Sequence, residues 1–382
     1  MSRFRKILLA VTSVAHVPFV VAAAELARRL GAGPLAAWSI GVALALAGLL
    51  LFFGRVQHLA EDWHRPWWQT WLVDLPYFCH WSACIYAVVP SIVYCVLEPL
   101  VDLARGAREL GPSPSFFLWC YASGLVVSTY ACTVRRWFFV TRHVDIAVRG
   151  LDARFDGYTI AQLSDLHIGA FHPLWWGRRW ARAANAANAD MVVVTGDMVT
   201  SGVAFHEDIA ELIGDLRSKD GVYVIMGNHD YFGEGEPLVS LLRGREVHVL
   251  RNEGVVLERE GAKLFLAGID DTWTKRANLE KALAERPAGV PTVLLAHDPD
   301  GFLGAVKRNV DVVLSGHTHG GQIAVPFLSR FVNLSRFAHR FHIGRYVDGD
   351  STLYVNGGLG TTGPPIRLGV APSIALIRLR AA

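Results

Sequence analysis

The chain has 382 residues, of which 37 are Lys or Arg and 34 are Asp or Glu, so its net charge is +3. So small a charge on so long a chain gives no sign of nucleic-acid binding, and no nucleic-acid partner is expected. All five cysteines lie before residue 133, which excludes a disulfide framework in the rest of the chain. Because the composition changes near residue 140, we predict an apolar region over 1–140, a linker over 141–150 and a second domain over 151–382.

Four long apolar stretches dominate the first 140 residues. A helix needs about 20 apolar residues to cross a hydrocarbon core about 30 Å thick. The sequence therefore predicts an all-α region of four transmembrane helices, with membrane lipids as partners. These spans are expected roughly at residues 7–24, 35–53, 75–97 and 116–134. A cleaved signal peptide competes for the first, but the charged residues that follow it favour an uncleaved span.

Lys and Arg in the flanking segments predict the orientation, because cytoplasmic loops carry an excess of them. Basic residues precede the first span, at Arg3, Arg5 and Lys6, and four arginines follow the last one between residues 135 and 149. With four spans both flanks lie on one side of the membrane. We therefore predict a multi-pass protein of the bacterial inner membrane with its second domain in the cytoplasm.

Two histidines, His16 and His80, fall inside predicted spans. An ionisable group within a membrane can mark a pathway for ions or protons. Hydrogen bonding within the helix bundle is the simpler expectation for both.

From residue 158 the pattern alternates short apolar runs with polar or amphipathic segments, which predicts an α/β domain. A further segment, 247–260, is split by Asn252-Glu253-Gly254 and predicts a hairpin, so antiparallel pairing is expected beside the parallel strands. The other predicted strands are 158–163, 191–195, 222–226, 263–267, 292–296, 310–314, 352–355 and 374–379.

Five short polar clusters lie between residues 165 and 319, each at the end of an apolar run. They are Asp165-Leu166-His167, Gly196-Asp197, Gly227-Asn228-His229-Asp230, Ala296-His297-Asp298 and Gly316-His317-Thr318-His319. In α/β folds, the loops at the carboxyl ends of strands aim side chains into one crevice. The candidate ligands carry nitrogen and oxygen only, which suits two divalent ions chosen among Mn, Fe, Zn, Ni and Co. Two ions about 3.5–4 Å apart acidify a bridging water and neutralise charge on a phosphoryl group.

In their order and chemistry these clusters resemble the calcineurin-like metallophosphoesterases over residues 151–382. The run Gly-His-Thr-His-Gly-Gly-Gln and the segments 268–271 and 357–367 are most similar to the bacterial YkuE- and YaeI-like phosphodiesterase branch of that family. The resemblance implies two packed mixed sheets flanked by helices, a sandwich that the periodicity alone does not establish.

The resemblance also implies roles for individual residues. Asp165, His167 and His319 would hold the first ion, and Asn228, His297 and His317 the second. Asp197 would bridge the two ions. His229 would contact the scissile phosphate and protonate or stabilise the leaving oxygen, while Asp230 would orient the His229 imidazole.

The spacing of His317 and His319 leaves two geometries open. On an extended backbone, residues two apart point the same way. A tight turn after Gly316 would instead aim the two imidazoles at separate ions.

Two stretches combine arginine with aromatic residues. Over 171–187 a helix would place Trp176 and Trp180 on one face and Arg178, Arg179 and Arg182 on another. The arginines either form a solvated face or meet lipid headgroups and substrate phosphates.

Phenylalanine and arginine alternate over residues 327–345, and Arg330 is among them. They could line a groove for a lipid-bearing phosphoester or form a packed surface loop. Arg367 is a weaker candidate for a phosphate contact. Asp270 and Asp271 are expected to end a strand in a turn rather than to reach the site.

The sequence thus predicts a membrane-anchored enzyme that hydrolyses a phosphoester or pyrophosphate bond by attack of a metal-bridging hydroxide. Anchoring favours a lipid-linked substrate. The alternatives are a hydrolase of a soluble nucleotide or phosphoprotein, and a non-enzymatic membrane sensor or scaffold that uses the same fold.

Overall fold

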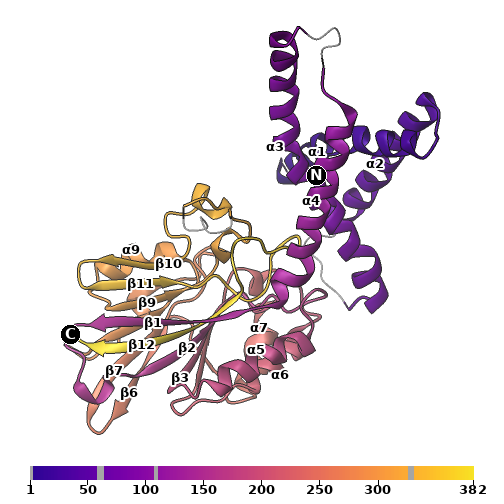
Figure 1. Ribbon diagram of the computed structural model, residues 1–382. Helices are drawn as coiled ribbons and strands as arrows, with labels where there is room; N and C mark the ends of the chain where they lie inside the picture. The colour runs from indigo at the N-terminus through magenta and orange to yellow at the C-terminus, as the bar shows by residue number, and fades with distance from the viewer. Residues whose placement is uncertain (1–2, 58–63, 107–110, 326–330) are drawn as a thin grey trace. The chain divides into compact units, whose positions relative to one another are not determined.

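The computed structural model describes residues 3–57, 64–106, 111–325 and 331–382 (Figure 1). The chain divides into two compact units. We call Met1–Leu59 with Pro66–Val134 the helical unit, and Ala60–Arg65 with Arg135–Ala382 the sheet unit.

The helical unit contains four long helices: α1 (Arg3–Arg29), α2 (Pro34–Gln57), α3 (Leu75–Ala104) and α4 (Pro114–Tyr130). Short π-helical segments precede α3 (η1, Gln69–Asp74) and follow α4 (η2, Ala131–Arg135). By length and composition, all four are able to cross a membrane, over Lys6–Arg29, Pro34–Arg55, Gln69–Ala104 and Pro114–Arg135. Many of their apolar side chains are exposed, as on helices whose outer faces meet lipid.

The sheet unit is built on two six-stranded mixed sheets. The first runs in the order β1-β12-β2-β3-β4-β5 and the second in the order β10-β11-β9-β8-β7-β6. The first sheet comprises β1 (Val140–Val148), β2 (Thr159–Leu163), β3 (Met191–Thr195), β4 (Val222–Ile225), β5 (His248–Val249) and β12 (Ser373–Ala381). The second comprises β6 (Glu253–Arg259), β7 (Ala262–Gly268), β8 (Thr292–Leu295), β9 (Val312–Ser315), β10 (Gly344–Asp348) and β11 (Ser351–Val355).

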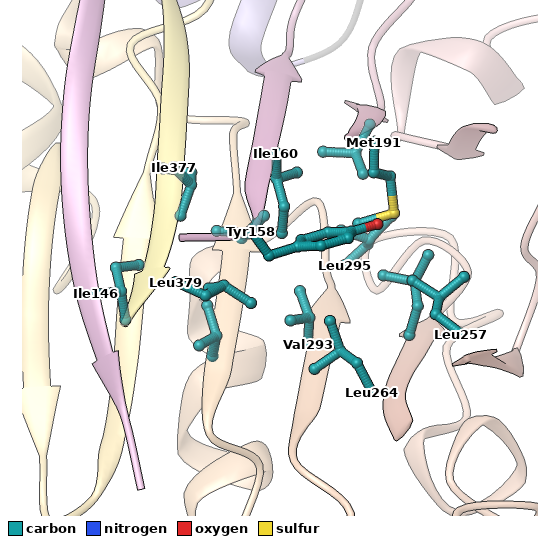
Figure 2. Packing of buried hydrophobic residues seen from close by; sticks show 14 of the residues in the cluster. Ile146, Tyr158, Ile160, Met191, Leu257, Leu264, Val293, Leu295, Ile377 and Leu379 are labelled. Carbon is teal, nitrogen blue, oxygen red and sulfur yellow. The ribbon is translucent and has the colours of Figure 1, made fainter. Parts of the chain in front are cut away.

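The main core lies between the two sheets. Figure 2 shows Ile160 and Ile377 of the first sheet facing Val293 and Leu295 of the second, with Tyr158 beside them. These side chains are buried and contact one another, so the sheets form the predicted sandwich.

Helices cover the outer faces of the sandwich. On the second sheet, α8 (Leu279–Ala282) packs through Ala282 and α9 (Phe302–Val306) packs through Phe302 into a cluster that includes Phe265 of β7. Beside the first sheet lie α5 (Leu174–Ala186), α6 (His206–Gly214) and α7 (Gly235–Arg243) (Figure 1). Helix α5 buries Trp176 and Trp180, as the helical periodicity predicts.

The predicted hairpin over 247–260 is wrong in its pairing. Its first half becomes β5, which runs parallel to β4 in the first sheet, whereas its second half becomes β6 in the other sheet. The antiparallel partner of β6 is β7, and the turn between them is Glu260-Gly261, with φ of 51° and 86°. Two consecutive positive φ values are typical of a tight hairpin turn, so the turn after β6 fixes the register.

The predicted linker is also wrong, because most of residues 141–150 belong to β1. This strand pairs in parallel with β12, from Val140 opposite Ser373 to Val148 opposite Ala381. Ile146 and Val148 are fully buried, so the segment belongs to the core of the sheet unit. The long continuous stretch of the sheet unit therefore begins at Arg135 rather than at residue 151.

One buried carboxylate ties the two sheets together, and we predict that its charge stabilises the sheet unit. Asp190 accepts hydrogen bonds of 2.8 Å from both the amide and the hydroxyl of Thr159, and Lys219 and Arg259 lie 3.1 Å from it. Burial alone would raise the pKa of Asp190, but these partners outweigh it and lower the pKa to about 2. The stabilisation is therefore present above the unfolded pKa near 3.9 and is lost as the pH falls towards about 2.

Asp190→Asn should lower the free energy of unfolding of the sheet unit by about 1–2 kcal/mol at pH 7, a value reduced for solvent screening. Urea unfolding of the purified chain at pH 7 and pH 3 measures the difference, which should shrink at the lower pH. Asp348→Asn, at an exposed carboxylate of β10, is the control. An equal loss at both pH values would contradict the charge argument.

Candidate metal centre

Five parallel strands deliver the predicted ligands to one place. In the first sheet, β2, β3 and β4 are neighbours, and the loops after them carry Asp165 with His167, then Asp197, then Asn228. In the second sheet, β8 precedes His297, and its neighbour β9 precedes the two histidines of the last cluster. The carboxyl ends of parallel strands lie at one edge of a sheet, so both sheets contribute to one site.

The first group of side chains consists of Asp165, His167, Asp197 and His319, whose candidate ligand atoms lie within 4.8 Å of one another. The Nε2 atoms of His167 and His319 are 3.0 Å apart. His319 Nε2 is also 3.4 Å from Asp165 Oδ1, and His167 Nε2 is 3.7 Å from Asp197 Oδ2. All four residues are buried, so the group can hold a cation away from bulk water.

The second group consists of Asp197, His297 and His317, within the same 4.8 Å limit. His297 Nε2 lies 3.2 Å from Asp197 Oδ2 and 3.3 Å from His317 Nδ1. The other ring nitrogen of His297 donates to the Thr195 carbonyl at 2.7 Å, which turns Nε2 towards the group. Asp197 belongs to both groups, so one carboxylate lies between two candidate ion positions.

His317 and His319 fall in different groups, which confirms the tight-turn alternative. Their φ angles are 69° and 52°, on either side of Thr318 at −81°. An extended backbone would have given neither value.

Five of the predicted ligands have a positive φ: Asp165, His167, Asp197, His317 and His319. Residues with a Cβ rarely adopt this region, and each such residue costs of order 1–3 kcal/mol unless the surrounding structure compensates. Strain of this kind concentrates at functional sites.

Glycines make room for the strained turns. A Cβ on Gly316 would lie 2.4 Å from Asp165 Oδ2, and one on Gly227 would lie 2.3 Å from Asp197 Oδ1. The glycine before a ligand therefore allows a neighbouring loop to approach its carboxylate.

Burial and charge set the protonation of the site. Burial alone would raise the pKa of Asp197, but His297 and His229 outweigh it and hold the pKa well below its usual range. Burial would lower the pKa of His297, but Asp197 outweighs it and raises the pKa to about 10. Burial raises the pKa of Asp165 to about 6 and lowers that of His167 to about 3. Without metal, the positive charge of protonated His297 therefore offsets the negative charge of the Asp197 carboxylate.

The donor set fits metal ions. Asp165 Oδ2 and Asn228 Oδ1 are buried and have no hydrogen-bond partner among the described residues. Unpaired buried oxygens are costly, and divalent cations take oxygen and imidazole ligands readily. Asp165 Oδ2, with the facing imidazoles of His167 and His319, is therefore suited to one cation, and Asn228 Oδ1 is suited to the other.

His229 lies at the edge of the site, but its orienting partner differs from the expectation. Its Nδ1 donates to the Thr200 carbonyl at 2.6 Å, and its Nε2 lies 3.3 Å from Thr362 Oγ1. The prediction that Asp230 orients the imidazole is wrong.

Asp230 instead accepts backbone hydrogen bonds from two loops. Its Oδ1 accepts from the amides of Met198 and Val199, at 2.8 and 3.1 Å, and its Oδ2 accepts from that of Gly227 at 2.8 Å. The carboxylate therefore fastens the loop after β3 to the loop after β4 and supports Asp197 and Asn228 indirectly.

The structure describes two of the three weaker substrate-binding candidates, Arg367 and Arg178. Arg367 is fully buried, donates to the carbonyls of Gly357 and Gly360, and lies 3.3 Å from His319 Nδ1. A guanidinium so enclosed cannot reach a substrate phosphate. Its hydrogen bonds to backbone carbonyls instead support the loop behind His319. Arg178 forms an ion pair with Glu211 of α6. Arg330 lies outside the described residues.

The second aromatic stretch is divided between core and surface. Phe341 packs in the core against Phe302, whereas Phe331 is exposed. Arg336 and Arg345 donate to backbone carbonyls. The stretch therefore does not form one continuous surface of rings and guanidinium groups among the residues that the structure describes.

Several residues at the site escape sequence analysis. The ring of Phe232 lies 4.5 Å from that of His229, and the ring of Trp273 lies 5.2 Å from that of His317. Both are well exposed, at 42% and 61%. Thr200 acts through its backbone carbonyl, which has no side-chain signal. Trp273 follows Asp270-Asp271, which form the expected turn, and only its isolation in a polar loop could have drawn attention to it.

The protonation of the site predicts how metal affinity depends on pH. A metal ligand must be unprotonated, so binding expels the proton of His297 below its pKa of about 10. Burial lowers the pKa values of His167 and His317 to about 3 and about 4, so both rings are already neutral at pH 7 and release no proton when a metal binds. We expect the affinity for Mn²⁺ to rise about tenfold per pH unit from pH 7 to pH 9. Below pH 6 the rise should be steeper, because Asp165 also binds a proton.

Competition with a chromophoric chelator measures this slope, and calorimetry in two buffers of different ionisation enthalpy counts the protons released. An affinity that stays constant from pH 7 to pH 9 would contradict the protonated His297.

Comparison with known proteins identifies the family. A family model described as calcineurin-like phosphoesterase matches residues 158–321. The uncharacterized metallophosphoesterase YkuE of Bacillus subtilis is 32% identical over 230 residues, 59% of this chain and 80% of that protein. A Danio rerio protein named transmembrane protein with metallophosphoesterase domain is 32% identical over 329 residues, 82% of this chain and 74% of that protein. The chain therefore belongs to the calcineurin-like metallophosphoesterase family.

Proposed function

We propose that the protein is a membrane-anchored phosphoesterase that uses two divalent metal ions. The observation that carries this proposal is the Asp197 carboxylate, which is shared by the two groups of side chains. When bound, the ions would acidify a water molecule and neutralise charge on the phosphoryl oxygens. Asp165, His167 and His319 would hold one ion, and Asn228, His297 and His317 would hold the other.

His229 is the residue placed to handle a proton. Because its Nδ1–H is committed to the Thr200 carbonyl, only Nε2 can donate towards a substrate, and it does so in the imidazolium form. A proton delivered from Nε2 to the leaving oxygen would assist cleavage of the ester bond.

We further propose that the substrate carries an apolar group on its phosphate, as a lipid-linked phosphoester or pyrophosphate does. Two well-exposed aromatic rings, Phe232 and Trp273, stand beside the site histidines and would cover such a group. Four apolar helices would keep the enzyme at the membrane where such a substrate resides. The cytoplasmic orientation is part of this proposal and rests on the basic flanks of the spans.

A turnover assay tests the substrate class. The purified chain, loaded in turn with Mn²⁺, Fe²⁺, Zn²⁺, Ni²⁺ and Co²⁺, is given lipid-linked phosphodiesters and pyrophosphates, soluble nucleotides and a phosphopeptide. We expect the highest kcat/KM for a lipid-linked compound, and Trp273→Ala should lower it mainly through KM. Trp175→Ala removes an exposed indole that contacts Trp137, and it serves as the control.

Two outcomes would redirect the proposal. Equal or better turnover of soluble nucleotides or the phosphopeptide, unaffected by Trp273→Ala, would favour a soluble substrate. Metal binding without turnover of any compound would favour a sensor or scaffold.

A further inference from the structure

A second cluster of metal-binding side chains lies inside the helical unit. His16 of α1, His80 and Cys84 of α3 offer ligand atoms within 4.8 Å of one another. They lie away from the ends of the apolar spans Lys6–Arg29 and Gln69–Ala104. The cluster is separate from the phosphoesterase site, because all of its members belong to the helical unit.

His16 has a nitrogen lone pair that no residue in the described part of the chain uses. Its side chain is buried, with 2% exposed, and its Nδ1 donates to the Thr12 carbonyl at 2.8 Å. In the neutral ring this hydrogen bond leaves Nε2 as an acceptor. Nε2 is buried and has no hydrogen-bond partner among the described residues. A buried polar atom without a partner lowers the stability of a protein, and more so within a membrane. A metal ion bound to this nitrogen would remove that cost.

His80 and Cys84 stand one helical turn apart on α3. Cys84 is fully buried, and its Sγ lies 3.8 Å from either ring nitrogen of His80. Two ligand atoms at roughly 2.1 and 2.3 Å from a tetrahedral ion are about 3.6 Å apart, so this pair already has nearly the required spacing. The hydroxyl of Tyr121 on α4 lies 2.9 Å from His80 Nδ1. This hydroxyl oxygen can accept a hydrogen bond from His80 Nδ1–H, which leaves the lone pair of His80 Nε2 as a second one for an ion.

Helix α2 leaves space at the point where the two imidazoles meet. A Cβ added at Gly48 would lie 3.1 Å from His16 Nε2 and 3.3 Å from His80 Nε2. Both Nε2 atoms therefore face the same glycine, and any larger residue there would press on both rings.

We propose that His16, His80 and Cys84 bind one thiophilic transition-metal ion, Zn²⁺ or Cu⁺, within the helical unit. Thiolate and imidazole together select these soft or borderline ions. The thiolate charge offsets the charge of the ion, which lowers the cost of holding it among apolar helices. The fourth position of a tetrahedral ion would be open to water. The ion joins α1 to α3 and satisfies the free nitrogen of His16, which a hydrogen-bonded His80–Tyr121 pair alone does not do.

Sulfur distinguishes this ion from the metals of the phosphoesterase site. The five cysteines all belong to the helical unit, at Cys79, Cys84, Cys95, Cys120 and Cys132. A metal–sulfur distance of about 2.3 Å therefore cannot come from the nitrogen and oxygen ligands of the sheet unit.

The test uses the full chain in detergent, carrying Asp197→Ala to weaken the phosphoesterase site, and loaded separately with Zn²⁺ and with Cu⁺. We expect one tightly bound equivalent of at least one of these ions, with a sulfur shell in X-ray absorption. Cys84→Ser should remove the sulfur shell and weaken binding at least tenfold, whereas Cys95→Ser, at an exposed cysteine of the same helix, should change neither. Binding without sulfur, a shell that survives Cys84→Ser, or no binding of either ion would overturn the proposal.

A second variant guards against misfolding. His16→Gln keeps a polar group on α1, and it should also weaken binding at least tenfold. In the chain with Asp197 intact, Cys84→Ser and His16→Gln should retain phosphoesterase turnover, which shows that the protein is folded. If either variant binds the ion as tightly as its parent chain, its residue is not a ligand and the proposed site is wrong.

Discussion

Asp197→Ala should lower phosphoesterase turnover by about 10³-fold or more and remove two equivalents of metal from the chain. The carboxylate is the member common to both groups, with Oδ2 at 3.2 Å from His297 and 3.7 Å from His167. Mutation of residues that merely support a metal ligand typically costs about 10–100-fold in affinity or activity, and loss of a shared ligand should cost more. Elemental analysis and steady-state kinetics on the same preparation measure both effects.

The same substitution has a local structural consequence, because Asp197 Oδ1 accepts a hydrogen bond of 2.9 Å from the His229 amide. Asp197→Asn keeps an oxygen that can accept this bond but loses the charge. It should therefore fold like the parent and still bind metal poorly. Asp348→Ala, at an exposed carboxylate of β10, controls for the preparation. Metal content and turnover like those of the parent in Asp197→Ala would refute a shared carboxylate.

The ligands that directly follow a strand could be predicted from the sequence. Asp165, Asp197 and His297 each follow a short apolar run, and neighbouring parallel strands bring their carboxyl ends together. The protein-family resemblance then supplied the expectation of two sheets. The order of apolar runs and polar clusters along the chain therefore predicts where these ligands lie in the structure.

Pairing between distant strands could not be predicted in the same way. β1 and β12 are separated by most of the sheet unit, and their parallel register depends on the core that both strands face. The segment before β6 illustrates the same limit. The sequence allows a turn at Asn252, yet the two halves of the segment join different sheets, and β6 pairs with β7 across Glu260-Gly261 instead.

Roles that depend on burial also escaped the sequence. Arg367 was a reasonable phosphate ligand by charge, but its guanidinium is enclosed by the carbonyls of Gly357, Gly360 and His319. Asp230 was a reasonable partner for its neighbour, but three backbone amides occupy its oxygens. In both cases the side chain organises loops, and only the tertiary structure shows where those loops run.

The second large effect concerns proton delivery. His229→Ala should slow turnover of an alkyl phosphoester by about 10²–10⁴-fold, as expected for loss of a general acid. The ring is not a member of either group of candidate ligands, so metal content should stay that of the parent. Stopped-time assays with elemental analysis of the same sample check both expectations.

The leaving group separates proton delivery from simple binding of the phosphate. A nitrophenolate leaves without a proton, so His229→Ala should slow a nitrophenyl ester far less than an alkyl ester. His248→Ala, which removes an exposed imidazole stacked on Tyr223, should leave both rates unchanged. If His229→Ala slows the two esters equally, the imidazole positions or neutralises the phosphate instead. If neither rate changes, His229 has no catalytic role and its imidazole only forms the hydrogen bond to the Thr200 carbonyl.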